Sequence, residues 1–455
     1  MDKNNGAIYD ARKLGKPKMI ILGVQHMFAM FGATILVPIL TGLDISTTLL
    51  MAGLGTLLFH CITKFKVPAF LGSSFAFLGG YAAIKAFSPN DPNSMLPYAC
   101  LGVACAGLIY FILAAVIKAV GIEKVMRFFP PVVTGPIIIA IGLGLAPSAV
   151  SNCTTNWFLA VVALAVIVVF NIWGKGMAKI IPIILGLLIS YGTGLVLYFI
   201  SQANPDLIQN VPWIFSGGAD ANGVYQPIFD FTSLNTICDN ISKGHIFGSE
   251  GLIGIPIHWD KTVFGGIDYS NGALIASSII AIVPIAFATM MEHIGDICAI
   301  SSTTGNNYIK DPGLHRTLVG DGLATTLASL FGGPANTTYG ENTGVLALTR
   351  VYDPRVIRIA AYFAVAVSFF PIVSVIIGSI PSCIIGGISF VLYGMISAIG
   401  VRNVVENKVD FTKSRNLIVA AVILVCALGL SSDTVSFTIG SAAITLSPLA
   451  VASIA

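Results

Sequence analysis

The chain has 455 residues, of which 55% are hydrophobic and only 10% are charged, and its formal net charge is +3. So large an apolar share with so few charges lies outside the range of soluble globular domains, so the composition excludes a water-soluble core. It predicts an all-α protein that crosses a membrane many times. The segment Met1–Lys18 is polar and shows no cleavable signal peptide, so we expect the first apolar span to direct insertion.

Long apolar runs follow one another with short connections from about residue 20 to the end of the chain. A helix needs roughly 20 residues to cross the hydrocarbon core of a bilayer. On this basis we predict fourteen spanning segments, at residues 20–40, 46–63, 68–86, 96–118, 130–147, 157–174, 179–201, 272–293, 317–333, 336–349, 357–378, 381–400, 415–431 and 440–455. The third and the tenth are short and rich in Gly, Ser, Thr and Asn.

The basic residues test this count, because Lys and Arg in short loops stay on the cytoplasmic side of a membrane. With the N-terminus inside, all but three of the 24 basic residues fall in cytoplasmic segments. The exceptions are Lys85, Lys243 and Lys261. This bias predicts an even number of spans with both termini cytoplasmic. The positive charge therefore indicates orientation, and no nucleic-acid partner is implied.

A long hydrophilic insertion, residues 202–271, separates the spans into two sets of seven. We expect it to be extracellular. An odd number of spans in each half gives the halves opposite orientations, which is the arrangement of an inverted repeat. Such a repeat predicts that the unusual third span corresponds to the unusual tenth.

Both of these spans contain residues that do not suit a uniform helix. Pro68–Phe77 lies in the third span, and Pro334–Gly344 lies in the tenth. Irregular backbone at membrane depth is tolerated only where it lines a cavity or protein interior. Paired interruptions at matching positions therefore predict short strands and the binding site of a transporter.

Three acidic residues in or beside the spans are candidates for this site. Glu292 and Asp296 are four residues apart and so share one helix face, and Glu341 lies in the interrupted tenth span. A desolvated carboxylate can take up and release a proton, and it can accept hydrogen bonds from the N–H edge of a planar ligand. The alternative is that each carboxylate only satisfies local backbone or basic groups, which is most plausible for Asp296 near a span end.

Other residues are candidates for the wall of the site. His26 lies in the first span beside Gln25, and Phe75, Tyr339 and Tyr393 could stack on a ring. Packing alone is an equal alternative for Tyr393, and a satisfied core histidine is the commoner interpretation of His26. Phosphate-loop, dinucleotide and zinc motifs are missing from the sequence, so we expect no enzyme, no metal and no cofactor other than a coupling proton.

Five motifs spread along nearly the whole chain closely resemble those of the uracil carriers of the nucleobase–ascorbate transporter family. They are Gln25-His26 with the nearby Phe31–Thr34, Pro68–Phe75, Glu292–Gly295, Asp311–Arg316 and Asn336–Asn342. The resemblance implies a secondary transporter that imports uracil with protons across the inner membrane. It also implies two inverted repeats of seven spans, and family members are often homodimers through one of their domains.

The resemblance further implies a division into domains and a set of site residues. The implied core domain comprises residues 1–128 and 272–380, and the gate domain comprises residues 129–201 and 381–455. Carried over position by position, the uracil-binding residues are the carboxylates Glu292 and Glu341, the backbone contacts Gly340 and Phe75, and the pocket-wall residues Tyr339, Tyr393, Ala33 and His26. Dimers of the family form through the gate domain.

One position departs from the family pattern. A well-known uracil carrier has a proton-linked histidine four residues after the first glutamate, where this chain has Asp296. Glu292 and Asp296 both stay candidates for the proton. The Tyr339–Asn342 sequence favours uracil over xanthine or urate, since purine carriers typically show a Gln-Asn pair there. An anion carrier of the same architecture is disfavoured because cavity carboxylates repel anions.

Overall fold

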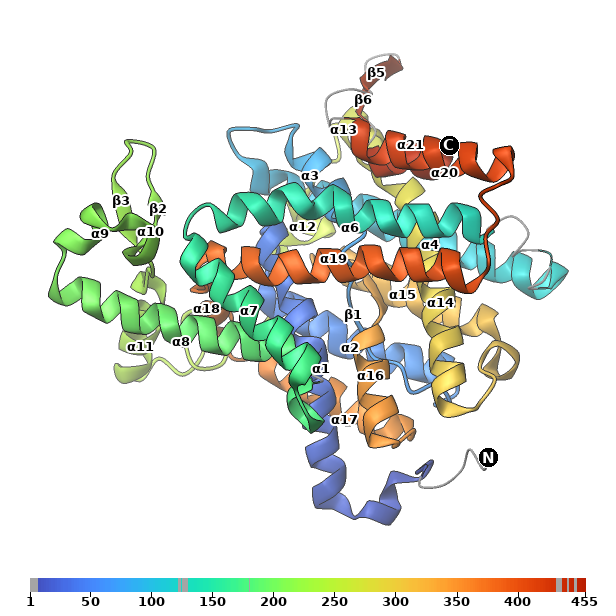
Figure 1. The fold of residues 1–455 in the computed structure, drawn as a ribbon, viewed down its shortest axis with the longest axis horizontal. Helices are drawn as coiled ribbons and strands as arrows, with labels where there is room; N and C mark the ends of the chain where they lie inside the picture. Colours follow the sequence, from blue (N-terminus) through green and yellow to red (C-terminus); the bar gives the residue numbers. More distant parts are fainter. Residues whose placement is uncertain are drawn as a thin grey trace. The chain divides into compact units, whose positions relative to one another are not determined.

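A computed structural model describes residues 7–121, 124, 130–179, 181–430, 436–439, 442–445 and 448–455 of the chain. Helices make up most of these residues, in agreement with the predicted all-α class (Figure 1). The predicted domain boundary at residues 128 and 129 lies outside the described residues.

Seven helices are long and apolar enough to span a membrane, counted over the described part of the chain, and an eighth is obtained if α17 and α18 together form one span. The seven are α1 (Lys16–Thr41), α2 (Ile45–Ile62), α4 (Leu96–Val120), α6 (Pro131–Cys153), α8 (Pro182–Ala203), the continuous run Gly272–Thr304 and α19 (Ser382–Glu406). Shorter apolar helices are α7 (Trp157–Trp173) and α20 (Ser414–Gly429). The exact count of fourteen stays a prediction.

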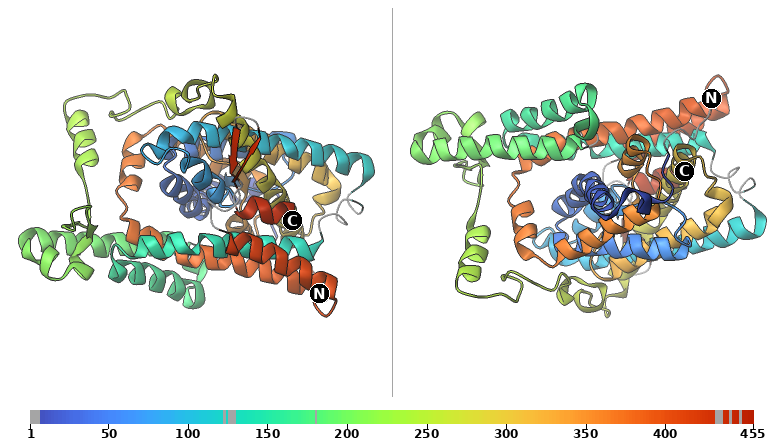
Figure 2. Two further views of the ribbon diagram at one scale, coloured as in Figure 1. Left: turned by 90° about the horizontal axis from the view of Figure 1, so that it is seen from above. Right: turned by 90° about the horizontal axis from the view of Figure 1, so that it is seen from below.

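The chain forms two compact units. The first comprises Met1–Ile141, Pro256–Phe369 and Ser397–Ala455, and the second comprises Gly142–Ile255 and Phe370–Ile396. In the first unit, α15 (Leu314–Leu330) packs against both α2 and α4, and α17 (Pro354–Ser368) packs against α1 and α2. In the second unit, α7 and α8 lie side by side (Figure 2). The core and gate domains expected from the resemblance stay a prediction.

The third and tenth predicted spans each consist of a short strand followed by a short helix. Strand β1 (Leu71–Ser73) precedes α3 (Leu78–Lys85), and strand β4 (Asn336–Thr338) precedes α16 (Gly340–Thr349). The two strands pair antiparallel, with Leu71 opposite Thr338 and Ser73 opposite Asn336. The pairing brings together two segments that are more than 260 residues apart in the chain.

Polar side chains from neighbouring helices complete the hydrogen bonding of this strand pair. Thr56 of α2 accepts from the Leu71 N–H at 2.9 Å, and Thr325 of α15 donates to the Asn336 carbonyl at 2.7 Å. Ser73 donates to the Thr34 carbonyl of α1 at 3.0 Å. Buried backbone groups need such partners, so these hydroxyls allow a strand pair to exist among membrane helices.

A 3-10 turn, Val283–Ile285, separates α13 (Gly272–Ile282) from α14 (Ala286–Thr304). Pro284 lies in this turn, where its ring and missing N–H interrupt regular α-helical hydrogen bonding. The two helices and the turn together still form one continuous apolar run, Gly272–Thr304, that is long enough to span a membrane.

Two predicted spans are wrong as single helices. The span at 357–378 is interrupted before Pro371, where α17 ends and α18 (Pro371–Gly378) begins. The span at 440–455 instead contains strand β6 (Ala442–Thr445), paired with β5 (Ser436–Ile439), and the short helix α21 (Pro448–Ile454). Proline cannot donate to a preceding turn, and β-branched Thr and Ile favour strands over helix.

The long hydrophilic insertion contains ordered elements. These are α9 (Asp206–Asn210), α10 (Pro212–Phe215), the hairpin strands β2 (Ser216–Ala219) and β3 (Tyr225–Pro227), α11 (Thr232–Ser242) and α12 (Val263–Gly266). In the second unit, Asn156 at the start of α7 donates to the carbonyls of Ile214 and Ser216. The early part of the insertion is thus anchored to a helix end.

Candidate functional site

The strand pair places the start of α16 in the first unit. Tyr339 precedes this helix, and its backbone N–H donates to the Phe70 carbonyl at 3.0 Å, so the helix begins directly at the end of the strand ladder. Glu341 lies in the first turn of α16. A carboxylate is favourable there because the first-turn N–H groups of a helix lack intrahelical partners.

The carboxylates of α14 lie beside the same strand pair. Asp296 accepts a hydrogen bond from the Thr338 hydroxyl at 2.8 Å, which joins α14 to β4. A Cβ built on Gly340 would lie 3.9 Å from the Asp296 Oδ1 atom, so the backbone at Gly340 is close to this carboxylate. Glu292 lies one turn earlier on the same helix. The structure thus brings Glu292, Asp296 and Gly340 into one neighbourhood.

A fourth carboxylate belongs to this neighbourhood and was missed by sequence reasoning. Asp321 lies in the middle of α15, and its Oδ2 atom is 3.1 Å from Nδ1 of His293 on α14. Both side chains are fully buried. The contact is an ion-pair contact and not an aligned hydrogen bond, since neither Asp321 oxygen has a hydrogen-bonding partner among the described residues. An aspartate inside a predicted span was the available signal.

Thr338 lies between Asp296 and the His293–Asp321 pair. Its hydroxyl donates to Asp296 and also lies 3.5 Å from the His293 Nδ1 atom. Asp296, Thr338, His293 and Asp321 therefore form one polar series across α14, β4 and α15, in which only Asp296 is partly exposed. Asp296, Asp321 and Glu341 are all near enough to Glu292 to act on it electrostatically.

Basic side chains do not neutralise this cluster. Within the part of the chain that the structure describes, Glu292, Asp296 and Glu341 form no ion pair with Lys or Arg. The same residues offer no group of His, Cys, Asp and Glu with the arrangement of a metal site. Like charges this close are costly unless a proton or a ligand with N–H donors reduces the repulsion.

His26 and Asn342 form a second polar group next to Glu341. The Asn342 amide nitrogen lies 3.2 Å from the His26 Nδ1 atom and donates to the His26 carbonyl at 3.1 Å. Three nearby buried atoms, His26 Nε2, Asn342 Oδ1 and Gln25 Oε1, have no hydrogen-bonding partner among the described residues. The pair fastens α16 to α1 and leaves both donor and acceptor capacity unused.

The candidate wall residues of the first unit lie around the strand pair. The Tyr339 hydroxyl donates to the Ser73 carbonyl at 2.9 Å, and its ring fills the space where a Cβ on Gly72 would be. Ala33 is buried on α1, and Phe75 is half-buried just after β1. Tyr339 therefore holds the two strands together, a packing role that leaves its hydroxyl engaged.

Tyr393 belongs to the second unit, where α19 carries it and its side chain is only 1% exposed. The structure therefore groups seven of the eight predicted substrate-binding residues, together with Asp296, in the first unit. The surroundings of Tyr393 are described only for the second unit.

In chemical terms the site offers hydrogen-bond acceptors beside the ends of strands and helices. Carboxylates accept N–H donors, and the ends of two strands and two helices supply main-chain N–H and C=O groups at the same place. This combination suits a flat, neutral ligand with several amide-like groups. It also provides carboxylates that can bind a proton.

Comparison with known proteins gives one family match and close relatives. The model of the Permease family matches residues 17–435. The uracil permease of Bacillus caldolyticus is 38% identical over 419 residues, which cover 90% of this chain and 85% of that protein. The uracil permease of Bacillus subtilis (strain 168) is 37% identical, with the same coverage of 90% and 85%.

A solved structure shares the fold. The transmembrane domain of a cyanobacterial bicarbonate transporter, BicA, matches with a TM-score of 0.64 over 99% of each chain, at 12% sequence identity. At that identity the similarity concerns the fold alone. A multi-pass helical membrane protein, as the composition predicts, agrees with both the family match and this fold.

Proposed function

This chain belongs to the Permease family, and from that premise we propose that it imports uracil in symport with protons across the inner membrane. It is a transporter and not an enzyme. The observation that carries the proposal is the set of unneutralised carboxylates, Glu292, Asp296 and Glu341, beside the paired strands β1 and β4. The names of the two Bacillus relatives support uracil as the substrate.

Uracil has two N–H donors and two carbonyl acceptors in one plane. In the proposed complex, Glu292 and Glu341 accept hydrogen bonds from the N–H groups, and the backbone of Gly340 and Phe75 contacts the ring edge. Tyr339, Ala33 and His26 form the proposed wall, and Tyr393 stays a candidate for substrate binding. Hydrogen bonds to an ionised partner are among the stronger ones, so two carboxylates can supply much of the selectivity.

The proposed coupling proton binds within the carboxylate cluster. Adding a proton to Glu292 or Asp296 removes one of several like charges and so reduces their mutual repulsion. His293 links Asp321 to the same cluster, because its Nδ1 atom lies 3.1 Å from Asp321 Oδ2 and 3.5 Å from the Thr338 hydroxyl. No other cofactor is proposed.

The carboxylate cluster also helps to decide between the alternative substrates, which are an anion and a purine. An anion such as bicarbonate would meet three carboxylates that form no ion pair with Lys or Arg of the described residues, which opposes its binding. A xanthine or urate carrier is the nearest alternative, because purines present similar N–H and carbonyl groups. The Tyr339–Asn342 sequence is the feature that favours a pyrimidine over a purine.

The proposal includes the membrane location, the orientation and the oligomeric state of the protein. We place it in the cytoplasmic membrane with both termini inside, on the basis of the 24 basic residues and their distribution. A homodimer through the proposed gate domain is part of the same proposal, since family members resemble one another in this respect.

Uptake of radiolabelled uracil into proteoliposomes tests the proposal. We expect faster uptake when the outside is acidic, and competition by excess uracil stronger than by xanthine, hypoxanthine or ascorbate. Uptake that ignores the proton gradient would contradict symport, and stronger competition by xanthine would replace uracil with a purine.

A substitution tests the carboxylate site. Glu341→Ala should abolish uracil binding, and Glu341→Gln should weaken it by about tenfold or more, because a hydrogen bond to a charged group contributes roughly 1.5–3 kcal/mol. The matched control is Glu406→Gln, which removes an exposed carboxylate paired with Arg402 on α19. Equal binding by Glu341→Gln and the control would reject this site.

A further inference from the structure

The segment Ala7–Leu14 precedes the first long helix and lies against the chain between α16 and α17. Ile8 forms a parallel bridge with Val351: its N–H donates to the Arg350 carbonyl, and its own carbonyl accepts from Tyr352 N–H, both at 2.8 Å. Ala11 is fully buried and packs with Val351 and Val356. We call this segment, residues 7–14, the N-terminal clip.

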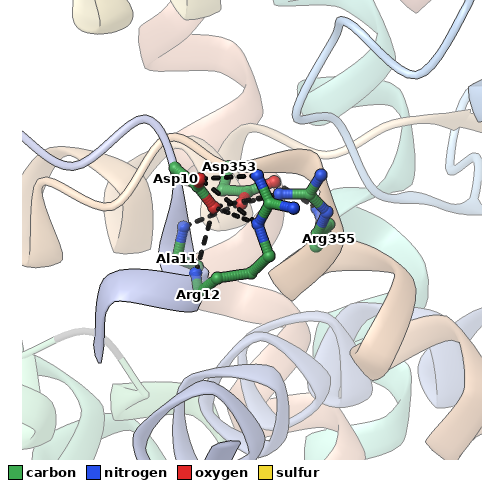
Figure 3. A network of polar contacts seen from close by, with 5 residues as sticks. All are labelled: Asp10, Ala11, Arg12, Asp353 and Arg355. Carbon is green, nitrogen blue, oxygen red and sulfur yellow. Dashed lines mark hydrogen bonds and ion pairs between the residues drawn. The ribbon is translucent and has the colours of Figure 1, made fainter. Parts of the chain in front are cut away.

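A polar network fastens the clip (Figure 3). Asp10 accepts hydrogen bonds from Arg12 at 2.8 Å and from Arg355 at 3.0 Å, and the Ala11 N–H donates to Asp353 at 2.8 Å. Asp353 also caps the start of α17 through the Arg355 N–H. The hydrogen bonds from Arg12 hold the pKa of Asp10 well below its usual range, so Asp10 is ionised near neutral pH and keeps both arginine contacts.

The clip also reaches α14. The Tyr9 hydroxyl donates to the carbonyl of Thr304, the last residue of that helix, at 2.7 Å. The Tyr9 ring packs edge-on against Tyr352, with centroids 5.5 Å apart. Carbonyls at the end of a helix lack intrahelical partners, so this hydroxyl satisfies a group that would otherwise need water.

The clip therefore touches the ends of both helices that carry the proposed substrate carboxylates. Helix α14 carries Glu292 and ends at Thr304, and α16 carries Glu341 and ends at Thr349, just before Arg350. Near the site, α14 is joined by the Thr338–Asp296 hydrogen bond to β4, the strand that leads directly into α16. The rise of an α-helix is about 1.5 Å per residue, so Thr304 lies about 12 Å beyond Asp296 along α14, and Thr349 lies about 12 Å beyond Glu341 along α16. The clip contacts the helices at or next to these two residues.

We propose that the N-terminal clip positions Glu292 and Glu341 for uracil by joining α14 and α16 at the ends remote from the strand pair. This inference rests on the proposed function. Two helices joined at one point can pivot, whereas two joined at both ends keep the spacing of the groups they carry. Tyr9 and Asp10 act through α14 and α16 and are positioning residues.

Two conservative variants test the clip. Tyr9→Phe removes only the hydroxyl that bonds Thr304, and Asp10→Asn removes the carboxylate charge that Arg12 and Arg355 share. We expect each to raise the dissociation constant for uracil about two- to tenfold, the effect of losing one or two net hydrogen bonds. Hydrogen exchange should become faster at residues 300–304 and 345–352.

Matched controls remove the same chemistry elsewhere. Tyr269→Phe removes a tyrosine hydroxyl that donates to the Val263 carbonyl at 2.7 Å, and Glu406→Gln removes the carboxylate of the Arg402 ion pair. Neither should change uracil affinity. Asp10→Glu restores the charge and should recover at least part of the wild-type affinity.

The outcomes separate the clip from the proposed function. Unchanged exchange in Tyr9→Phe and Asp10→Asn overturns the clip, and so does faster exchange with unchanged uracil affinity, which would make the segment a stabiliser of the fold only. Failure of the wild-type protein to bind uracil counts against the proposed function. The exchange measurement needs no ligand and still tests the clip in that case.

Discussion

Acidic residues in or beside the predicted spans are the most unusual side chains of this protein. A charged residue at the centre of a spanning helix costs about 2.5–3.5 kcal/mol on insertion scales, so several carboxylates in one region require compensation. The described structure compensates three of these carboxylates in different ways. Asp296 accepts a hydrogen bond from the Thr338 hydroxyl, Asp321 is in ion-pair contact with His293, and Glu341 lies in the first turn of α16. Glu292 is left most dependent on a proton or a ligand.

The His293–Asp321 pair can be tested by a double-mutant cycle. Because both side chains are fully buried, Asp321→Asn should lower the free energy of unfolding by about 1–3 kcal/mol, since it leaves His293 without its charged partner. The cycle itself compares His293→Phe, Asp321→Leu and the two combined, and the double variant should lose less than the sum of the singles, because apolar replacement of both partners avoids an unpaired buried group. Chemical unfolding in detergent measures each variant. Additive losses in the double variant would mean that the pair is not coupled.

At the scale of elements, the strand pair β1–β4 and the half-helices α3 and α16 define the site. The strands are only three residues long, and they persist because Thr56 and Thr325 complete their backbone hydrogen bonds while Ser73 ties β1 to the Thr34 carbonyl of α1. A uniform helix would satisfy its own backbone and leave no main-chain groups for a ligand. The interruption is therefore what makes a binding site available within the spans.

A substitution at Gly72 tests how tightly the strand pair β1–β4 is packed. A Cβ at Gly72 would lie 2.5 Å from the Tyr339 ring and 2.8 Å from the Thr34 hydroxyl, so Gly72→Ala should destabilise the protein by about 1–3 kcal/mol and reduce uracil uptake. Gly79→Ala is the matched control, because no atom lies within 4 Å of its Cβ position and alanine favours the helix α3. Thermal unfolding and uptake should be measured on both. A loss in Gly79→Ala as large as in Gly72→Ala would argue against the packing explanation.

At the scale of the whole molecule, the proposed orientation determines which surfaces meet each side of the membrane. The insertion between α8 and α13 carries the exposed Cys238 on α11, and the proposed topology would put this insertion outside the cell. In the same proposed topology the N-terminal clip would lie on the cytoplasmic side. Substrate would therefore enter from the side remote from the clip.

Thiol labelling in intact cells tests this topology. Cys238 should react with a membrane-impermeant reagent added from outside, and Cys238→Ser should remove that labelling. A tag fused after Ala455 should become accessible only after permeabilisation. Labelling of Cys238 that requires permeabilisation would reverse the orientation, and with it the direction proposed for import.

Much of this protein follows from local properties of its chain. Hydrophobic runs predict a multi-pass membrane protein, the Gly-, Thr- and Asn-rich segments predict the interrupted third and tenth spans, and Glu292, Asp296 and Glu341 are visible as charges where charges are costly. The Thr and Ile residues before Pro448 favour strands, and this local signal was available as well. The prediction of a helix at 440–455 was nevertheless wrong.

Other features depend on residues that are distant in the chain, and a local pattern holds no information about such partners. The register of Leu71 with Thr338, the contact of His293 with Asp321 and the bond from Tyr9 to Thr304 were decided only by the tertiary structure. Hydropathy and charge report what each segment needs, namely burial, a hydrogen bond or a counter-charge. Packing of the helices in three dimensions determines which residue meets that need.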